Sequence, residues 1–367
     1  MKINNVLLVL FCFGILFGGD IDRQLIMAGK NKKEIKKALR KAPKAHRGGM
    51  HWLIKHMPDE DLKSVTSEFL LENCEFAYKA WKETSWGRKI PEDIFFEYVL
   101  PFANLNEKRE SWRKDFYYRF SDIMRNSASA YQAAASLNNN MFEMVGVKYS
   151  TKRPKADQSP YESMEAGLAS CTGLSILLID ACRSIGVPAR FVGTPMWYNN
   201  SGNHSWVEIW DNGWHVTGAA EPTGDELNNF WFSALASRAV EGHPKYGIYA
   251  ATWANTEIHF PMDWLPDVDS YNAVDVTESY IKNVDESLVP IRIRALDSKG
   301  ERQKLAVVVT GGDNFWFEGT TKSELSDAND HLTLMLPKGK NFTISADDDK
   351  RKISIEKEKL IEFKISE

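Results

Sequence analysis

Cys171 and His204 are the two side chains whose types and surroundings best suit attack on a carbonyl group. Cys171 begins a predicted helix, where the helix dipole and unpaired N–H groups favour a thiolate and could stabilise an oxyanion. His204 begins a predicted strand, and an imidazole beside a thiol can accept its proton. Residue types alone fit equally well a buried, inert thiol and a histidine that hydrogen-bonds at a strand end.

The elements that must position this pair are predicted by hydrophobic periodicity. A helical face runs from Cys171 to Ile185, with Gly186 as its C-terminal cap. A short strand follows at 189–193, and alternation predicts another at 205–210. The turn Asp211-Asn212-Gly213 is typical of a hairpin that returns through 214–217. We therefore expect a helix packed on antiparallel strands.

The segments before and after this region differ in their hydrophobic patterns. The stretch before residue 140 is mostly helical, with long helices expected at 59–81 and 111–137. From about residue 288, alternating apolar runs separated by Gly and Asp turns predict a small all-β sandwich. We predict the following division: signal peptide 1–19, helical N-terminal region 20–140, core 141–283 and β-sandwich accessory domain 284–367.

The first residues predict export. Met1-Lys2 precedes an apolar run, Val6 to Gly19, that is shorter than the roughly 20 residues of a membrane span. We read it as a secretory signal peptide, with a retained anchor as the alternative. The expected location is periplasmic, cell-surface or secreted, with possible association with the envelope. Three cysteines, Cys74, Cys171 and Cys182, remain after its removal, so at least one thiol stays free within a single chain.

Composition excludes some classes of partner. The chain has 46 Lys+Arg and 50 Asp+Glu among 367 residues, a net charge of -4, which argues against a dedicated nucleic-acid binder. Hydrophobic residues make up 43%, enough for a large core. No close pair of Cys or His has the spacing of a zinc site, so we expect no metal and no cofactor.

The segment from Gln158 to Pro222 resembles the transglutaminase-like superfamily, which includes animal transglutaminases, bacterial cysteine peptidases and peptide:N-glycanases. The resemblance rests on the Gly-x-x-x-Cys-x-Gly opening at 167–173, the run Gly186-Val187-Pro188-Ala189-Arg190, the pattern His204-x-Trp206-x-Glu208, and Trp214. It implies an α+β fold with a papain-like transglutaminase core, and makes Cys171 the nucleophile and His204 the general base.

The third catalytic residue departs from the family pattern. The family's Asp is expected where this chain has Gly218. Glu221, from the next loop, is our candidate for orienting His204, with a surface carboxylate as the alternative reading. Gln158 is a candidate oxyanion donor, although a polar loop residue is the simpler interpretation. Trp206 and Trp197 are candidate substrate contacts, and core packing is the alternative for Trp206.

The sequence therefore predicts an exported thiol enzyme that cleaves or transfers an amide acyl group, with hydrolysis favoured. The expected substrate is a protein, peptide or glycopeptide. The alternative is a weak or inactive transglutaminase-like module that binds protein or glycan, and the Gly218 departure supports that reading.

Overall fold

The computed structural model describes residues 21–266, 268–281, 284–312 and 314–365. The chain forms two compact units, Met1–Leu71 and Glu72–Glu367, which are treated separately below. The predicted signal peptide, 1–19, lies outside the described residues. None of the helices in the described part of the chain has the length and apolar character that a membrane crossing requires. The predicted domain boundaries at 140 and 283 stay predictions.

The first unit is helical. It contains α1 (Asp22–Met27), α2 (Lys32–Lys41), α3 (Arg47–His56), α4 (Asp59–Ser64) and the start of α5 (Ser67–Glu83), with 3₁₀ turns at Gly29–Asn31 and Lys44–His46. The single helix predicted for 59–81 is wrong, because the chain breaks at Val65. The Asn31 amide donates to the Val65 carbonyl at 2.8 Å, and the Glu34 carboxylate accepts from the Ser67 N–H at 2.9 Å. Polar groups from α2 and the turn before it thus satisfy both new helix ends.

The second unit contains the remaining helices. They are α6 (Glu92–Tyr98), α7 (Trp112–Arg119), α8 (Ser121–Asn126), α9 (Ala130–Val145), α10 (Pro160–Ala166), α11 (Cys171–Ser184) and α12 (Ser233–Ala236), with 3₁₀ turns at Gly87–Lys89 and Thr277–Ser279. The prediction of one continuous helix at 111–137 is wrong. The segment divides at Phe120 and again before Ser129, whose side chain accepts from the Gln132 N–H and starts α9.

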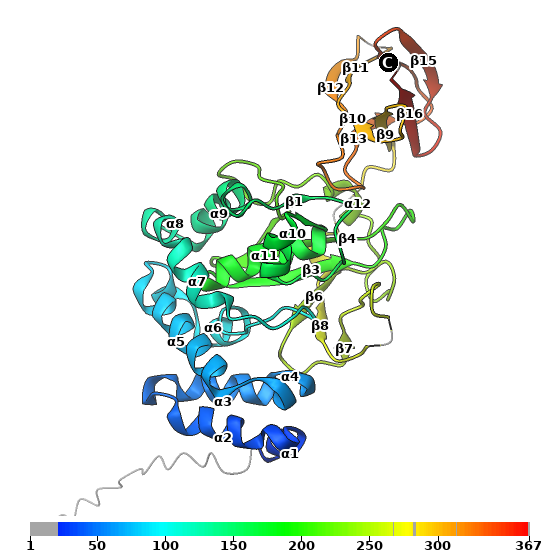
Figure 1. Ribbon diagram of the computed structural model, residues 1–367. Helices are drawn as coiled ribbons and strands as arrows, with labels where there is room; N and C mark the ends of the chain where they lie inside the picture. Colours follow the sequence, from blue (N-terminus) through cyan, green and yellow to red (C-terminus); the bar gives the residue numbers. More distant parts are fainter. Residues whose placement is uncertain (1–20, 267, 282–283, 313, 366–367) are drawn as a thin grey trace, which may run out of the picture. The chain divides into compact units, whose positions relative to one another are not determined.

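A six-stranded antiparallel sheet supports α11. Its strands are β3 (Ala189–Thr194), β4 (His204–Trp210), β5 (Trp214–Thr217), β6 (Tyr249–Thr252), β7 (Ile258–His259) and β8 (Asn272–Asp275), in the order β5-β4-β3-β6-β8-β7. Helix α11 packs on β3 and β4, and α7, α9 and α10 pack on α11 (Figure 1). Every residue of α11 after Cys171 is buried. The predicted helix and the first three strands are confirmed, but the helix is buried all round.

The C-terminal strands form a sandwich of two sheets. One sheet contains β9 (Leu288–Leu296), β10 (Arg302–Gln303), β13 (Leu332–Pro337) and β16 (Lys359–Lys364); the other contains β11 (Ala306–Gly311), β12 (Trp316–Thr320), β14 (Asn341–Ala346) and β15 (Asp349–Ser354). Alternate residues of both sheets, such as Ile293 and Val309, form one core. Pairing is antiparallel except for β16 beside β9. The predicted all-β accessory fold is confirmed.

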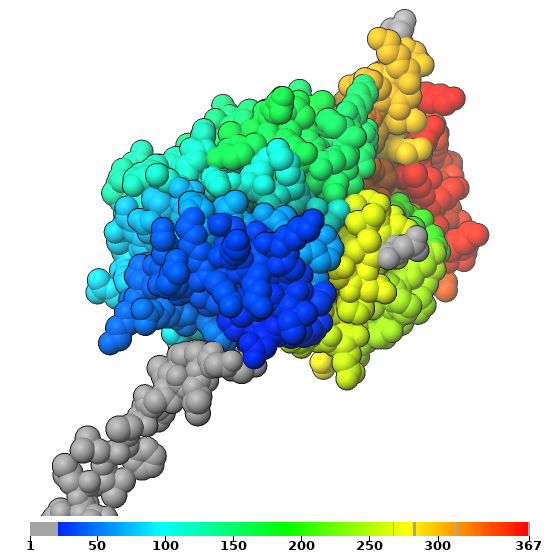
Figure 2. Space-filling view, turned by 60° about the horizontal axis from the view of Figure 1, so that its bottom comes forward, coloured from blue at the N-terminus to red at the C-terminus, as the bar shows by residue number. Residues whose placement is uncertain are grey.

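The sandwich lies against the central part of the same unit. Its residues, in orange and red in Figure 2, adjoin green residues of the central part. In that part β1 (Lys148–Tyr149) pairs in parallel with β2 (Leu168–Ala169). The Tyr149 hydroxyl accepts from the Ala328 N–H at 2.9 Å, and Glu358 accepts from the Tyr198 hydroxyl at 3.0 Å. The first contact holds the loop between β12 and β13 beside β1, and Asp327 of that loop lies near Cys171 at the start of α11. The second joins the segment between β15 and β16 to the loop between β3 and β4.

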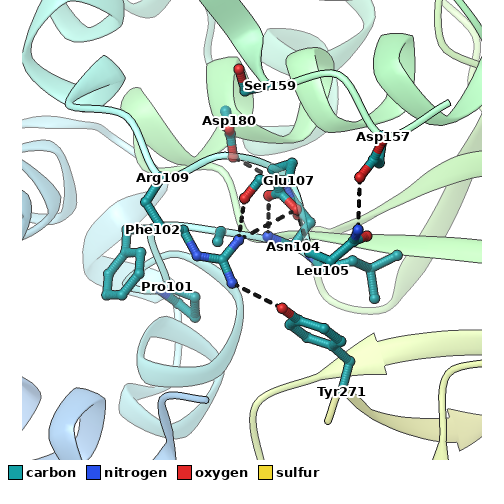
Figure 3. A network of polar contacts seen from close by, with 12 residues as sticks. Pro101, Phe102, Asn104, Leu105, Glu107, Arg109, Asp157, Ser159, Asp180 and Tyr271 are labelled. Carbon is teal, nitrogen blue, oxygen red and sulfur yellow. Dashed lines mark hydrogen bonds and ion pairs between the residues drawn. The ribbon is translucent and has the colours of Figure 1, made fainter. Parts of the chain in front are cut away.

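A buried polar network ties the loop before α7 to α11 (Figure 3). The Asn104 amide donates to Asp180 of α11 at 3.1 Å, while the Asn104 N–H donates to Glu107 at 2.6 Å. Arg109 lies 3.7 Å from Glu107 and donates to the Tyr271 hydroxyl at 3.4 Å. Burial, with Glu107 nearby, raises the pKa of Asp180 well above its ordinary value. The network fixes α11 against the loop and against the residue that precedes β8.

Arg113 of α7 also holds the loop between α6 and α7. It is buried, and its guanidinium donates to the Asn73 side chain at 2.6 Å and to the carbonyls of Val99, Pro101 and Arg183 at 2.9, 2.8 and 3.0 Å. Carbonyl groups without a partner in the interior carry a desolvation penalty. The guanidinium therefore supplies donors to carbonyls of the irregular segment after α6, and a further donor to the Arg183 carbonyl, which also accepts from the Gly186 N–H at 3.2 Å.

We expect Arg113→Met to lower the free energy of unfolding by roughly 3–5 kcal/mol, because it leaves several buried acceptors unpaired. The matched control is Lys114→Met, whose side chain is 54% exposed and lies 4.0 Å from Glu72. That change should stay within about 0.5 kcal/mol. Urea unfolding of both variants measures the difference, and equal stabilities would contradict a structural role for Arg113.

Candidate functional site

Cys171 is the first residue of α11 and is partly exposed. The preceding Ser170 caps the helix, since its hydroxyl accepts from the Gly173 N–H at 3.3 Å. The N–H groups of Cys171 and Thr172 belong to the first turn, which precedes the intrahelical ladder. The thiol therefore sits beside backbone donors at the positive end of the helix dipole. Cys74 and Cys182, by contrast, are buried, and burial raises the pKa of the Cys74 thiol to about 12.

His204 is the first residue of β4 and pairs in register with Thr194 of β3. Its side chain is 1% exposed. Four aromatic rings pack around the imidazole, with centroids between 4.8 and 6.2 Å away: Trp197, Trp206, Trp231 and Phe232. The structure brings Cys171 and His204, the two residues proposed from the sequence, close together. The Cys171 sulfur, a ring nitrogen of His204 and a carboxylate oxygen of Asp327 all lie within 4.8 Å of one another.

The remaining residues of the sequence pattern hold β4 in place. Arg190 of β3 lies opposite Glu208 of β4, and the two form a buried ion pair with 2.6 Å between the guanidinium and the carboxylate. The Arg190 guanidinium lies 3.7 Å from the ring centroid of Trp214, on β5. The Tyr280 hydroxyl donates to the same Glu208. The pattern thus fixes the strand that presents His204.

Two carboxylates flank the imidazole. Asp327 Oδ2 lies 3.4 Å from Nδ1, and Glu221 Oε2 lies 3.9 Å from Nε2. Both contacts are longer than strong charge-assisted hydrogen bonds. Burial by itself would lower the pKa of His204, but Asp327, Cys171 and Glu221 raise it well above 6.5. Burial raises the pKa of Glu221 to about 7; the imidazole opposes this shift and Asp327 adds to it.

The Glu221 side chain occupies the space beside Gly218. A Cβ atom at Gly218 would meet Glu221 Oε2 at 1.8 Å, so the Glu221 carboxylate fills the volume that a side chain at 218 would occupy. The Asn138 amide donates to the Gly218 carbonyl at 2.8 Å, and the Asn138 side-chain oxygen accepts from the Ala220 N–H at 2.9 Å, which fixes the turn between them. The structure thus has Glu221 Oε2 3.9 Å from Nε2 of His204, and its orienting role stays a prediction.

Asp327 was missed by sequence reasoning. It lies in the loop between β12 and β13 of the C-terminal sandwich, and its side chain is 2% exposed. Asn329 donates to Asp327 Oδ1 from its N–H at 2.8 Å and from its amide at 3.2 Å. Although burial opposes the shift, His204 and Asn329 lower the pKa of Asp327. No local sequence signal marks this residue, because only the docking of the sandwich brings it to His204.

Three further candidates have structural positions. The Gln158 amide donates to the Glu162 and Leu168 carbonyls at 3.3 and 3.0 Å, and its side chain is not among those that line the Cys171 pocket. The oxyanion role is therefore unsupported in this conformation, because both amide hydrogens are used. Trp197 and Trp206 are buried and stacked behind His204, with centroids 6.1 Å apart. They pack against His204 and are not among the residues that line the pocket, so they offer no surface to a substrate.

A pocket of about 240 Å³ opens over Cys171. Its walls come from β1, α11, the loops that follow β5 and the loop between β12 and β13. The residues that decide its chemistry are Tyr149, Cys171, Glu221, Trp231, Lys322, Asp327 and Asp330. Lys322 lies 3.4 Å from Asp330, so the one basic residue of the lining is paired. The pocket combines a thiol with three carboxylates and aromatic walls.

A family model matches the part of the chain that contains Cys171 and His204. Residues 119–219 match the family model of the transglutaminase-like superfamily, so this stretch is a transglutaminase-like domain. It contains Cys171, His204 and Gly218, but neither Glu221 nor Asp327. The search of curated proteins finds no match.

Two solved structures are similar to the chain in part. One was solved as a candidate cysteine protease of Cytophaga hutchinsonii: it is 17% identical, with a TM-score of 0.30, over 38% of this chain and 45% of that protein. The other is red sea bream transglutaminase: it is 9% identical, with a TM-score of 0.34, over 74% of this chain and 65% of that protein. The chain thus spans less than two thirds of the length of either protein.

We expect Gly218→Ala to displace the Glu221 carboxylate from Nε2 of His204, because the new Cβ would occupy its place. The rate of Cys171 alkylation by iodoacetamide should fall with it. Gly218→Asp combined with Glu221→Ala should restore much of the rate, since it moves the carboxylate to the position where the family has it. If Gly218→Ala alkylates like wild type, the carboxylate at Nε2 is dispensable.

Proposed function

We propose that the protein is a thiol enzyme of the transglutaminase-like superfamily that breaks an amide bond through an acyl-enzyme intermediate. Support comes from the family match and from one geometric observation. That observation is the approach of the Cys171 sulfur, at a helix N-terminus, to the buried His204 imidazole beneath an open pocket. The side chains come from different elements, α11 and β4, so their approach depends on the packing of helix on sheet.

The chemistry follows from the positions of these groups. His204 takes the thiol proton, and the thiolate attacks the carbonyl carbon to form an S–C bond. First-turn N–H groups of α11 face the developing oxyanion. Collapse breaks the C–N bond as the imidazolium donates its proton to the leaving amine. Glu221 acts as a positioning residue that holds the ring from the Nε2 side. A water or an amine then resolves the thioester and regenerates the thiol.

We favour hydrolysis of a protein, peptide or glycopeptide over transfer to an amine. The reasons are the apolar run expected to direct export and the appended β-sandwich, both typical of secreted peptidases. Location outside the cytoplasm is part of the same proposal. The pocket over Cys171 is wide enough for one side chain of a substrate at about 240 Å³.

The thiol–imidazole pair predicts selective alkylation of Cys171 by limiting iodoacetamide at pH 6, where a free cysteine of pKa about 8.5 reacts slowly. His204→Ala should slow labelling by roughly 100-fold, because it removes the proton acceptor. His215→Ala is the matched control, since His215 lies on β5 and pairs with Asn228 instead. Peptide mapping by mass spectrometry separates Cys171 from Cys74 and Cys182.

Equal labelling of Cys171 in wild type and His204→Ala would overturn the enzyme proposal and favour the binding-module alternative. If the pair is active, the enzyme is incubated with a pool of denatured proteins and a fluorescent primary amine. The products show whether water or the amine accepts the acyl group. Hydrolysis should give new peptide termini or free ammonia without fluorescence on the protein. Incorporation of the amine as the main product would assign transfer.

A further inference from the structure

We propose that Cys171, His204 and Asp327 form a binding site for Zn²⁺, and that the bound ion holds the thiol in a reversible, blocked state. The binding part stands on the geometry of these three side chains alone. The blocking part rests on the proposed function, because it assumes that the free thiol is the nucleophile. The site goes beyond that function, since the amide chemistry itself needs no metal.

The three groups have the spacing of metal ligands. In a tetrahedral zinc site with bond lengths near 2.0–2.2 Å, ligand nitrogen and oxygen atoms are separated by about 3.3 Å. His204 Nδ1 and Asp327 Oδ2 are 3.4 Å apart, and neither is joined to the other by a strong hydrogen bond. The Cys171 sulfur lies within 4.8 Å of a ring nitrogen of His204 and of a carboxylate oxygen of Asp327. A shift of about 1 Å at the thiol would complete the geometry.

The surroundings orient these ligands as an outer shell does. Asn329 directs two donors to Asp327 Oδ1, which leaves Oδ2 as the atom that faces His204. On the opposite side of the ring, Glu221 Oε2 lies 3.9 Å from Nε2. In zinc-bound histidine the second ring nitrogen is usually oriented by a carboxylate, a backbone carbonyl or a water, and the Glu221 carboxylate lies on that side of the ring.

The local charge also calls for a cation. Glu221 and Asp327 line the pocket beside the imidazole, whereas the charge of Asp330, which also lines it, is balanced by Lys322 at 3.4 Å. Without a metal, a Cys171 thiolate would face the Asp327 carboxylate within 4.8 Å and would be repelled by it. A divalent ion between them turns this repulsion into attraction. The ligand set of thiolate, imidazole and carboxylate suits Zn²⁺, whereas Ca²⁺ and Mg²⁺ require oxygen ligands.

Binding would replace the S–H bond of Cys171 by a Zn–S bond, and the thiol proton would pass to the buffer. The sulfur lone pair would then be shared with the ion and not be available for attack on a carbonyl. The fourth position would face the pocket, since both Cys171 and Asp327 line it. Because the ligands come from α11, β4 and the sandwich loop, the ion would also fasten the C-terminal domain to the core.

The test uses the full chain, reduced and freed of metal with a chelator that is then removed, and titrated with Co²⁺ as a spectroscopic probe for Zn²⁺. We expect the d–d absorption of tetrahedral Co²⁺ together with a thiolate-to-cobalt charge-transfer band, both displaced by Zn²⁺. Cys171→Ser should abolish the charge-transfer band. Asp327→Ala should weaken Co²⁺ and Zn²⁺ binding by about 100-fold or more.

Asp330→Ala is the matched control, because it removes a carboxylate from the same loop and pocket but not one of the three proposed ligands. It should retain the absorption bands and the affinity. Absence of a charge-transfer band in the wild type, or equal affinities for Asp327→Ala and Asp330→Ala, would overturn the zinc site. The charge-transfer band is measured on the wild-type protein. The zinc site can therefore be refuted even if the Asp327→Ala protein does not fold.

Alkylation separates this proposal from the proposed function. In chelator, fast labelling of Cys171 that depends on His204 supports the thiol enzyme, and added Zn²⁺ should suppress that labelling. Fast labelling that Zn²⁺ leaves unchanged overturns the blocking role alone. Slow labelling in chelator together with the cobalt bands overturns the thiol enzyme and supports a zinc-binding site.

Discussion

The burial of α11 on all sides is the constraint on which the rest of the second unit depends. Cys171 is the one partly exposed residue of α11, while every later residue of the helix is buried beneath the sheet and α7, α9 and α10. A helix buried in this way has no freedom to slide or turn, because its interior contacts are close-packed. The thiol is therefore fixed at one point, and the polar networks around Asp180 and Arg113 serve to keep that point in place.

The imidazole is held with similar rigidity but by other means. An ion pair between Arg190 and Glu208 joins the strands beside it, and aromatic rings surround it. The unusual feature is the pair of carboxylates, one at each ring nitrogen. A single imidazolium cannot neutralise two carboxylates and a thiolate. The four groups therefore carry a net negative charge unless a proton or a cation binds. That imbalance distinguishes this site from a simple thiol–imidazole pair.

The C-terminal sandwich has a direct part in the site. Its loop between β12 and β13 contributes a wall of the pocket and places Asp327 beside His204. Contacts at Tyr149 and Asn203 hold that loop, the latter through the Asn329 amide at 2.8 Å. An accessory domain that delivers a buried carboxylate to the thiol can influence the reactivity of that thiol, whatever else its outer surface binds.

The sequence by itself determined the local elements and the residues whose chemistry depends on local position. The helix that begins at Cys171, the strand that begins at His204 and the hairpin at Asn212 follow from periodicity and turn residues, which act over a few residues. It also proposed Glu221 as the residue beside His204, because the family's Asp position is Gly218 here, and the structure has the Glu221 carboxylate 3.9 Å from Nε2. Continuous periodicity concealed the breaks at Val65 and Phe120, since the groups that end those helices are supplied by packing and by other segments.

Tertiary structure alone decided which distant groups meet. Asp327 is separated from His204 by more than a hundred residues and lies in a loop without a motif, so only the docking of one folded element on another brings them to 3.4 Å. The same holds for Gln158, whose amide is used by backbone carbonyls, and for Trp197 and Trp206, which are buried behind the imidazole. Side-chain type limits what a residue can do, but which atoms it faces depends on the packing of the whole unit.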